Sequence, residues 1–297
     1  GPGGKDWLVT TDALVEGVHF RREWADPAVL GRKALAVNLS DIAAMGGVPR
    51  FYLVAIGLPP GDAAGAAPLI YDGMRGMANE HGALLIGGDT VASPSGIMIS
   101  ITAIGEVERG RAIVRSGAHP GDAIFVTGTF GSSGLGLGVL KSGRKGGSAE
   151  AFVRRHLYPV PRVAEGRWIA GTGMATAMID ASDGLVADLS HVADESGVGF
   201  EIDAPSVPLD DGFDEAARAL GHDPVKLALA GGEDYELVFT VADSRIAEFE
   251  KVAKGCPMRC RVTRIGTTVA DRHARLVIGS EGKALDLPSG GYDHFSQ

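Results

Sequence analysis

Four segments of this 297-residue chain place carboxylates beside glycine, serine or threonine where we expect an apolar strand to end. The four segments are Thr10-Thr11-Asp12, Gly87-Gly88-Asp89, Asp180-Ala181-Ser182-Asp183 and Gly231-Gly232-Glu233-Asp234, and we expect each to follow an apolar strand. A single aspartate in such a place is usually a turn former or a helix N-cap. Clustered carboxylates, however, repel one another without a cation. The joint pattern therefore favours several Mg²⁺ ions, which prefer oxygen ligands and substrate phosphates.

A fifth carboxylate, Asp41, lies inside an apolar segment that we predict to be helical, residues 27–45. Its apolar neighbours Val37 and Ile42 do not force Asp41 to the solvent side of the helix. An unpaired carboxylate near a core costs on the order of several kcal/mol. Asp41 is therefore a further candidate metal ligand.

The familiar nucleotide-binding motifs are missing from the sequence. The nearest segment to G-x-x-x-x-G-K-[ST], residues 138–142, lacks the glycine before the lysine, and no G-x-G-x-x-G begins at Gly134 or Gly136. Residues 128–134 could precede a helix and offer backbone N–H groups to an anion, or could be only a flexible turn. Both interpretations stay open, so we expect phosphates to be held mainly through metal ions.

Composition narrows the class of protein. Hydrophobic residues make up 45% and charged residues 22%, which suits one large globular domain or two of ordinary size. A formal charge of −9 without a basic stripe argues against nucleic-acid binding. No apolar run approaches the ~18 residues of a membrane span, so we expect no membrane partner. Cys256 and Cys260 make neither a disulfide framework nor a zinc site, which favours a cytoplasmic protein.

Alternating strands and helices are predicted to position the acidic segments. The predicted strands are residues 7–11, 50–58, 83–86, 97–107, 123–127, 175–179, 200–202 and 236–241. The predicted helices are residues 27–45, 66–81, 154–171 and 185–195. A turn-rich junction at residues 108–121 separates the two halves. We therefore expect two related α+β domains.

The segments together resemble those of the thiamine-monophosphate kinase family, within the aminoimidazole-ribonucleotide-synthetase-like superfamily. In family order they are TTDALVEGVHF (10–20), GRKALAVNLSDIAAMGGVP (31–49), IGGDT (86–90), RSGAHPGD (115–122), DASDGL (180–185), GGEDYEL (231–237) and GYDHF (291–295). They span nearly the whole chain. The ribonucleotide synthetases share a DGVGTK-type segment, and in its place this chain has EGVHF at 16–20, which looks like the kinase version.

The resemblance implies an α/β (α+β) two-domain synthetase-like fold. Residues 1–108 would form an N-terminal domain that binds ATP and metal and pairs with a second copy in a homodimer through a β-barrel. Residues 109–297 would form a C-terminal α/β domain. Thiamine monophosphate and ATP are the implied partners, with several Mg²⁺ ions. The family also carries a Gly-Asp-Asp-Ala-Ala segment with a metal-binding aspartate upstream of the first strand, and we expect that it precedes the sequence printed here.

Roles for individual residues follow from the resemblance. The implied metal ligands are Thr10, Thr11, Asp12, Asp41, Asp89, Asp180 and Asp183. The implied ATP contacts are Gly88, Asp89, Arg115 and Ser182, with Tyr71 as a weaker candidate for adenine. The thiamine-phosphate contacts are His19, Glu233 or its neighbour Asp234, and Tyr292, whose ring could stack on a cationic heterocycle. The expected catalytic residues are Asp12, Asp89, Asp180 and Arg115.

The implied reaction is in-line transfer of the ATP γ-phosphoryl group to the phosphate of thiamine monophosphate. That phosphate has a second pKa of about 6, so it is largely a dianion at neutral pH and needs no strong general base. Metal ions and Arg115 would offset the repulsion between the two polyanions. Two alternatives remain open. One is another ATP-dependent synthetase of the superfamily, and the other is a non-catalytic module that only anchors Mg-ATP.

Overall fold

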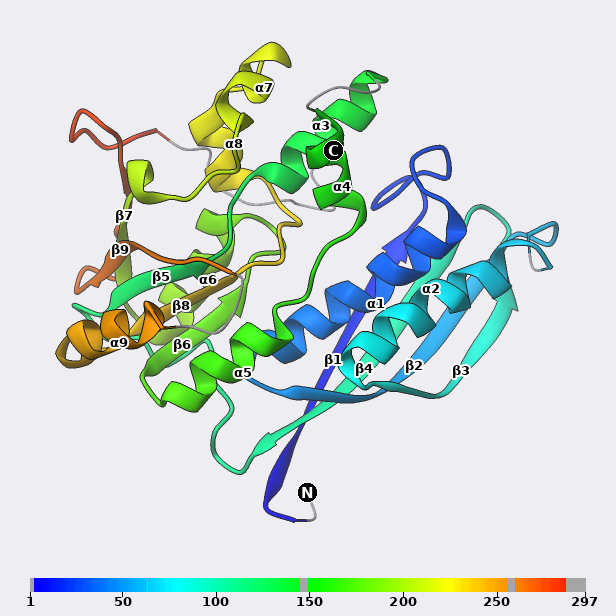
Figure 1. Cartoon of the computed structure of the whole chain (residues 1–297), viewed down its shortest axis with the longest axis horizontal. Helices are drawn as coiled ribbons and strands as arrows, with labels where there is room; N and C mark the ends of the chain where they lie inside the picture. Colours follow the sequence, from blue (N-terminus) through cyan, green and yellow to red (C-terminus); the bar gives the residue numbers. More distant parts are fainter. Residues whose placement is uncertain (1–2, 63, 145–148, 256–259, 287–297) are drawn as a thin grey trace. The chain divides into compact units, whose positions relative to one another are not determined.

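The computed structural model describes residues 3–62, 64–144, 149–255 and 260–286 (Figure 1). It divides the chain into two compact units. Unit 1 comprises residues 1–112 and 157–163, and unit 2 comprises residues 113–156 and 164–297. Among the described residues, no helix has both the length and the apolar character needed to cross a membrane.

Unit 1 is a four-stranded mixed sheet with two helices on one face (Figure 1). Its strands are β1 (Lys5–Val15), β2 (Val48–Leu58), β3 (Leu84–Ala92) and β4 (Met98–Glu108), in the spatial order β1-β4-β2-β3. Strands β2 and β3 are parallel, and the other pairs are antiparallel. The helices are α1 (Pro27–Ala44) and α2 (Ala66–His81). Among the described residues the sheet is open, and it forms no closed barrel within one chain.

The two faces of this sheet differ in what covers them. Helix α1 starts with a proline at its first position, which suits the fixed backbone angle of that residue, and it buries Leu35, Leu39 and Ile42. Side chains alternate across a strand, so Leu8 and Leu14 of β1 are buried on the helix side. The opposite face carries exposed apolar side chains, and every residue of β3 is exposed.

Unit 2 is a six-stranded mixed sheet with helices around it. Its strands are β5 (Ala123–Thr127), β6 (Ala175–Asp180), β7 (Gly199–Asp203), β8 (Leu237–Val241), β9 (Val262–Val269) and β10 (Arg275–Ile278), in the order β10-β7-β9-β5-β8-β6. Its helices are α3 (Ser132–Ser142), α4 (Glu150–Leu157), α5 (Val163–Thr172), α6 (Leu185–Ser196), α7 (Phe213–Ala219), α8 (Pro224–Ala230) and α9 (Ile246–Ala253). Every residue of β5 and β8 is buried, so these two central strands form part of the core.

The structure confirms the α/β fold and the predicted strands, and it corrects three local expectations. The predicted helix 154–171 is wrong: it is divided into α4 and α5 by a segment with Pro159 and Pro161, since proline interrupts a helix. Residues 10–12 and 87–89 lie inside β1 and β3, not after them. Residues 231–234 follow helix α8 and precede β8.

Candidate functional site

The first group of candidate ligands lies where β1 packs on α1. Thr10 donates a hydrogen bond of 2.5 Å from its hydroxyl to Oδ2 of Asp41. Asp12 lies two residues further along β1, and its backbone N–H donates to Oδ1 of the buried Asn38, 3.1 Å away. Strand alternation places the Thr10 and Asp12 side chains on the face that α1 covers. The structure therefore brings Thr10, Asp12 and Asp41 to one place, with Asn38 as a positioning residue that the sequence analysis missed.

Thr11 lies on the opposite face of β1. Its hydroxyl donates to the carbonyl of Ile101 at 3.1 Å and accepts from the hydroxyl of Thr102 at 3.2 Å. Both partners belong to β4, which pairs with β1. The side chain of Thr11 therefore does not join the group formed by Thr10, Asp12 and Asp41.

Asp89 lies on β3, at the other edge of the same sheet from Asp12. Its carboxylate accepts from the backbone N–H of Thr90 at 2.8 Å and is exposed. Three strand spacings separate β1 from β3, which amounts to about 14 Å. Two oxygens that bind the same Mg²⁺ lie within about 4 Å of each other. Within one chain, Asp12 and Asp89 therefore cannot share a single ion.

Gly88 has a steric reason to be glycine. A Cβ atom at this position would lie 2.0 Å from the carbonyl oxygen of Val54 on β2. Any side chain there would push β3 away from β2 and displace Asp89. Glycine at position 88 therefore lets β3 pair closely with β2 and so sets the position of Asp89.

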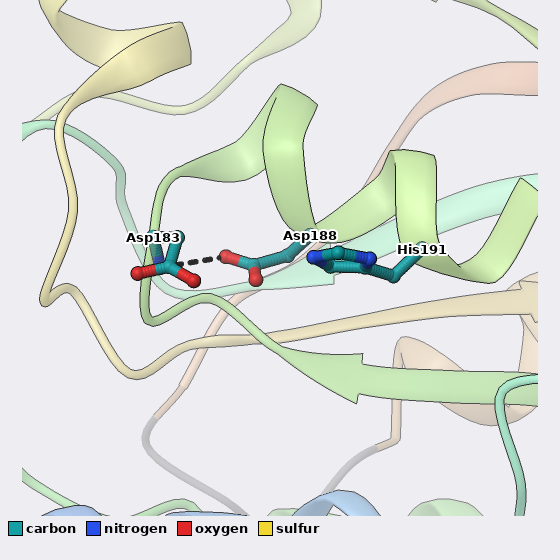
Figure 2. A group of neighbouring side chains, drawn as sticks. All are labelled: Asp183, Asp188 and His191. Carbon is teal, nitrogen blue, oxygen red and sulfur yellow. Dashed lines mark hydrogen bonds between the residues drawn. The ribbon is translucent and has the colours of Figure 1, made fainter. Parts of the chain in front are cut away.

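A second group lies at the start of helix α6 in unit 2 (Figure 2). Ligand atoms of Asp183, Asp188 and His191 lie within 4.8 Å of one another. The buried Asp188 carboxylate accepts from the backbone N–H groups of Asp183 and Gly184, at 3.0 and 3.1 Å. Burial, and then the charges of Asp180 and Asp183, raise the pKa of Asp188 to about 8. The sequence analysis missed Asp188 and His191, although both lie on the first turns of a helix that follows an acidic turn.

The turn at residues 180–183 and the loop at residues 231–236 are held together by backbone hydrogen bonds. The N–H of Glu233 donates to the carbonyl of Ser182 at 2.7 Å, and the N–H of Tyr235 donates to the carbonyl of Ala181 at 2.8 Å. Glu233 and Tyr235 have positive φ angles of 66° and 52°. Non-glycine residues seldom adopt this conformation, and it occurs mainly where surrounding contacts impose it.

Asp234 is buried and occupies the N-terminus of helix α3. Its two carboxylate oxygens accept from the backbone N–H groups of Gly131 at 2.6 Å and Ser133 at 3.0 Å. Burial raises the pKa of Asp234 to about 7, while these two hydrogen bonds oppose the rise. In residues 128–134, which we considered as a binding site for an external anion, the N–H groups of Gly131 and Ser133 therefore bind the chain's own Asp234. Glu233 and Asp234 are the two candidate contacts to the acceptor, and both carboxylate oxygens of Asp234 are already hydrogen-bonded to the backbone of α3 and the residue before it.

Glu236 and Glu233 flank this anchor in different surroundings. Glu236 is 1% exposed, accepts from the hydroxyl of Thr127 at 2.8 Å, and lies 3.1 Å from Nη2 of Arg155. Glu233 is 23% exposed, and its Oε2 lies 3.3 Å from Nδ1 of His156. Glu236 is thus buried and paired with the partly exposed Arg155, while the carboxylate of Glu233 itself remains partly accessible.

The remaining predicted residues are spread over both units. Nδ1 of His19 accepts from the N–H of Val15 at 3.0 Å, in a turn that follows β1. Arg115 is exposed, and its Nη1 lies 3.8 Å from Glu195. Tyr71 is half-buried on α2. Tyr292 lies outside the described residues.

Comparison with known proteins agrees with the resemblance seen in the sequence. Residues 2–107 match the AIR synthase related protein, N-terminal domain, and residues 119–279 match the AIR synthase related protein, C-terminal domain. The thiamine-monophosphate kinase of Bacillus subtilis (strain 168) is 37% identical over 98% of this chain and 89% of the relative. That of Escherichia coli (strain K12) is 39% identical over 99% of this chain and 88% of the relative.

A solved structure agrees with these relatives. The structure described as AaThiL complexed with AMPPCP and TMP is 35% identical, with a TM-score of 0.86 over 99% of this chain and 89% of that chain. The two family domains match more than half of the chain, and the curated relatives match nearly all of it. The chain therefore belongs to the thiamine-monophosphate kinase family.

Proposed function

We propose that the chain transfers the γ-phosphoryl group of ATP to the phosphate of thiamine monophosphate, forming ADP and thiamine diphosphate. The observation that carries the proposal is the likeness, over nearly the whole chain, to a structure described as complexed with AMPPCP and TMP. ATP and Mg²⁺ are supplied in the cytoplasm, and Cys260, which forms no disulfide among the described residues, suits a reducing compartment. We therefore place the protein in the cytoplasm.

The residues of unit 1 fit Mg²⁺ as ligands. The Thr10 hydroxyl and the carboxylates of Asp12 and Asp41 are hard oxygen donors, and Thr10 and Asp41 are already within hydrogen-bonding distance. Asp89 supplies another carboxylate from β3, and Asp180 and Asp183 supply a separate set in unit 2. When bound, Mg²⁺ offsets the negative charge of the phosphates. The chain's own task is to hold these oxygens in fixed positions.

The acceptor phosphate needs orientation more than deprotonation, because it is largely a dianion at neutral pH. With Nδ1 of His19 accepting from Val15, the neutral ring carries its proton on Nε2 and offers a donor to a phosphate oxygen. Glu233 would attract the cationic heterocycle of the acceptor, since Asp234 already serves the fold. Tyr292 remains the proposed aromatic contact to the acceptor.

The nucleotide contacts remain proposals that rest on the family motifs. Gly88, Asp89 and Ser182 would meet the phosphates, and Tyr71 the adenine ring. Arg115 belongs to unit 2 and is exposed. Its guanidinium group would add a fixed positive charge beside the ATP phosphates. We keep residues 1–108 as the proposed ATP- and metal-binding and dimerisation domain and residues 109–297 as the C-terminal domain.

The open sheet of unit 1 supports a homodimer. Its uncovered face and edges carry exposed apolar side chains, namely Trp7, Val9, Leu84, Leu85, Ile86, Val91 and Met98. Val9 is 63% exposed and Leu84 62% exposed, which is costly unless another surface covers them. A second copy is the natural partner, because two such sheets together could close into a barrel and remove both free edges.

The same pairing would solve the separation between Asp12 and Asp89. Among the described strands, β1 and β3 each pair on one side only. Two copies can close such a barrel with each edge strand beside its own counterpart or with β1 beside β3, and we propose the second arrangement, in which β1 of one copy adjoins β3 of the other. We infer that Asp12 of one protomer and Asp89 of its partner then serve the same bound nucleotide. The proposed dimer would therefore carry two shared metal sites.

A coupled assay for ADP tests the proposed function. Protein with ATP, thiamine monophosphate and Mg²⁺ should release ADP and thiamine diphosphate in equal amounts, and chelation of Mg²⁺ should stop both. ADP release that needs a different acceptor would indicate another synthetase of the superfamily. ATP binding by calorimetry without acceptor-dependent ADP release would indicate a nucleotide-binding module.

A further inference from the structure

A buried histidine contacts the carboxylate that we assign to the acceptor. His156 lies near the end of α4 and is 2% exposed. Its Nδ1 lies 3.0 Å from the hydroxyl of Ser133 and 3.3 Å from Oε2 of Glu233. Ser133 belongs to the first turn of α3 and is itself buried.

The chemistry of Ser133, His156 and Glu233 determines which group donates the hydrogen bond between His156 and Glu233. A carboxylate only accepts hydrogen bonds, so Nδ1 of His156 attracts Glu233 when it carries a proton. Water does not reach the imidazole, and a polar contact in such surroundings is stronger than on the surface. Ser133 contacts the same ring nitrogen and thereby restrains the ring.

The backbone of the loop is fixed independently. Asp234 ties the next residue to the N-terminus of α3, and Glu233 itself has a φ of 66°, in the left-handed region. The loop therefore fixes the position of the Glu233 backbone, and the contact with His156 fixes the position of the Glu233 carboxylate. Glu236 shows the contrast, because its carboxylate is enclosed with Arg155 and is 1% exposed, while that of Glu233 is 23% exposed.

We propose that His156, restrained by Ser133, is a positioning residue that holds the Glu233 carboxylate in the orientation that receives the cationic part of the acceptor. The proposal rests on the proposed function, because Glu233 is an acceptor contact only in a thiamine-monophosphate kinase. In this role His156 acts through Glu233. Its loss should therefore affect the acceptor and spare ATP.

Steady-state kinetics with both substrates varied tests this role. His156→Ala should raise the KM for thiamine monophosphate about tenfold and change the KM for ATP less than about twofold. His156→Asn keeps an N–H near the place of Nδ1 and should recover most of the loss. His222→Ala, at an exposed histidine in the same unit, is the matched control and should leave both KM values unchanged. Adding His156→Ala to Glu233→Gln should produce no further rise in the acceptor KM.

The outcomes separate the two proposals. If the unaltered protein releases no ADP with thiamine monophosphate, the proposed function fails. If it is active and His156→Ala changes both KM values equally, or adds its full effect to that of Glu233→Gln, the positioning role is overturned. If His156→Ala does not fold, His156→Asn is compared with Glu233→Gln instead. A folded His156→Asn protein of normal thermal stability whose KM for thiamine monophosphate is raised as much as in Glu233→Gln would overturn the positioning role.

Discussion

The candidate acidic residues of the two units look alike in the sequence but differ in their surroundings. In unit 1, Asp12 and Asp89 lie on strands at opposite edges of an open sheet, and Asp89 is exposed. In unit 2, Asp188 and Asp234 are buried, and each accepts two backbone N–H groups at the start of a helix. Asp188 and Asp234 of unit 2 therefore fix loops of the fold, while in unit 1 Asp89 is exposed at the surface and Asp12 is half-buried beside α1.

This difference shows why a motif with a carboxylate is not by itself a metal site. A buried carboxyl group whose oxygens accept from backbone N–H groups is held in place by the fold and is less available to a cation. A carboxylate on an exposed sheet edge costs little to keep and is available to cations, which can in turn bind phosphates. The division predicts that substitutions in unit 1 remove activity, while those at the anchors of unit 2 remove stability.

The largest effect is expected at Asp89. Asp89→Asn should lower kcat at least about 10³-fold, because a metal ligand at the phosphates is lost. Its thermal midpoint should remain unchanged, since the side chain is exposed and its hydrogen bond is to the neighbouring Thr90. Activity by the ADP assay and melting by circular dichroism give the two readouts. Asp72→Asn, an exposed change on α2, is the control, and near-normal turnover in Asp89→Asn would reject the ligand role.

Asp234 should show the opposite behaviour. Asp234→Ala leaves the N–H groups of Gly131 and Ser133 without their acceptor in a buried place. We expect the free energy of unfolding to fall by about 2–4 kcal/mol, measured by urea denaturation. A variant with unchanged stability and a specific loss of acceptor binding would instead assign Asp234 to the substrate.

The same carboxylate should also make stability depend on pH. The pKa of Asp234 is raised to about 7 in the folded protein, above an unfolded value of about 3.9. Between these values the folded state keeps a proton that the unfolded state has lost. The free energy of unfolding therefore falls as pH rises through this range, by up to about 1.4 kcal/mol per unit, and the contribution is complete only below pH 4 or so.

Asp234→Asn removes this proton and isolates the effect. The stability of the variant relative to the unaltered protein should increase as pH rises from 5 to about 7, and should level off above that, in buffer with EDTA. A difference that stays constant across this range would mean that Asp234 is ionised throughout.

A smaller effect is expected at His19. His19→Ala should raise the KM for thiamine monophosphate by less than about tenfold and leave the KM for ATP nearly unchanged, since one neutral donor is lost. Stability should change little, because the Val15 N–H lies beside a partly accessible turn and can bind water instead. Equal changes in both KM values would remove His19 from the acceptor side.

Local sequence patterns predict helices and strands well where the residues of the element itself determine its bounds. Helix α2 (Ala66–His81) and strand β5 (Ala123–Thr127) have the predicted bounds, and the motifs identified the family correctly. The break between α4 and α5 lies at Pro159 and Pro161, and helical spacing alone does not predict it. Strand β1 continues past Asp12 because it pairs along its length with β4, and that partner begins 83 residues after Val15, at Met98.

The surroundings of the candidate residues in unit 2 are set by contacts between residues far apart in the sequence, so local patterns do not predict them. Asp234 meets Ser133 across 101 residues of chain, and no spacing rule relates the two. His156 meets Ser133 from another helix, and a lone histidine in an amphipathic segment carries no local signal of such a partner. The contrast between Glu233 and Asp234 became visible only once burial was known.

The shared site in unit 1 can be tested most directly by mixing two inactive variants. Asp12→Asn and Asp89→Asn protomers are co-expressed with different tags, and the mixed dimer is purified and assayed for ADP release. If each site takes Asp12 from one protomer and Asp89 from its partner, every mixed dimer retains one intact site and should show about half of normal activity. If both residues serve the site of their own chain, both sites are damaged and the mixed dimer stays as inactive as its parents, which would contradict the account.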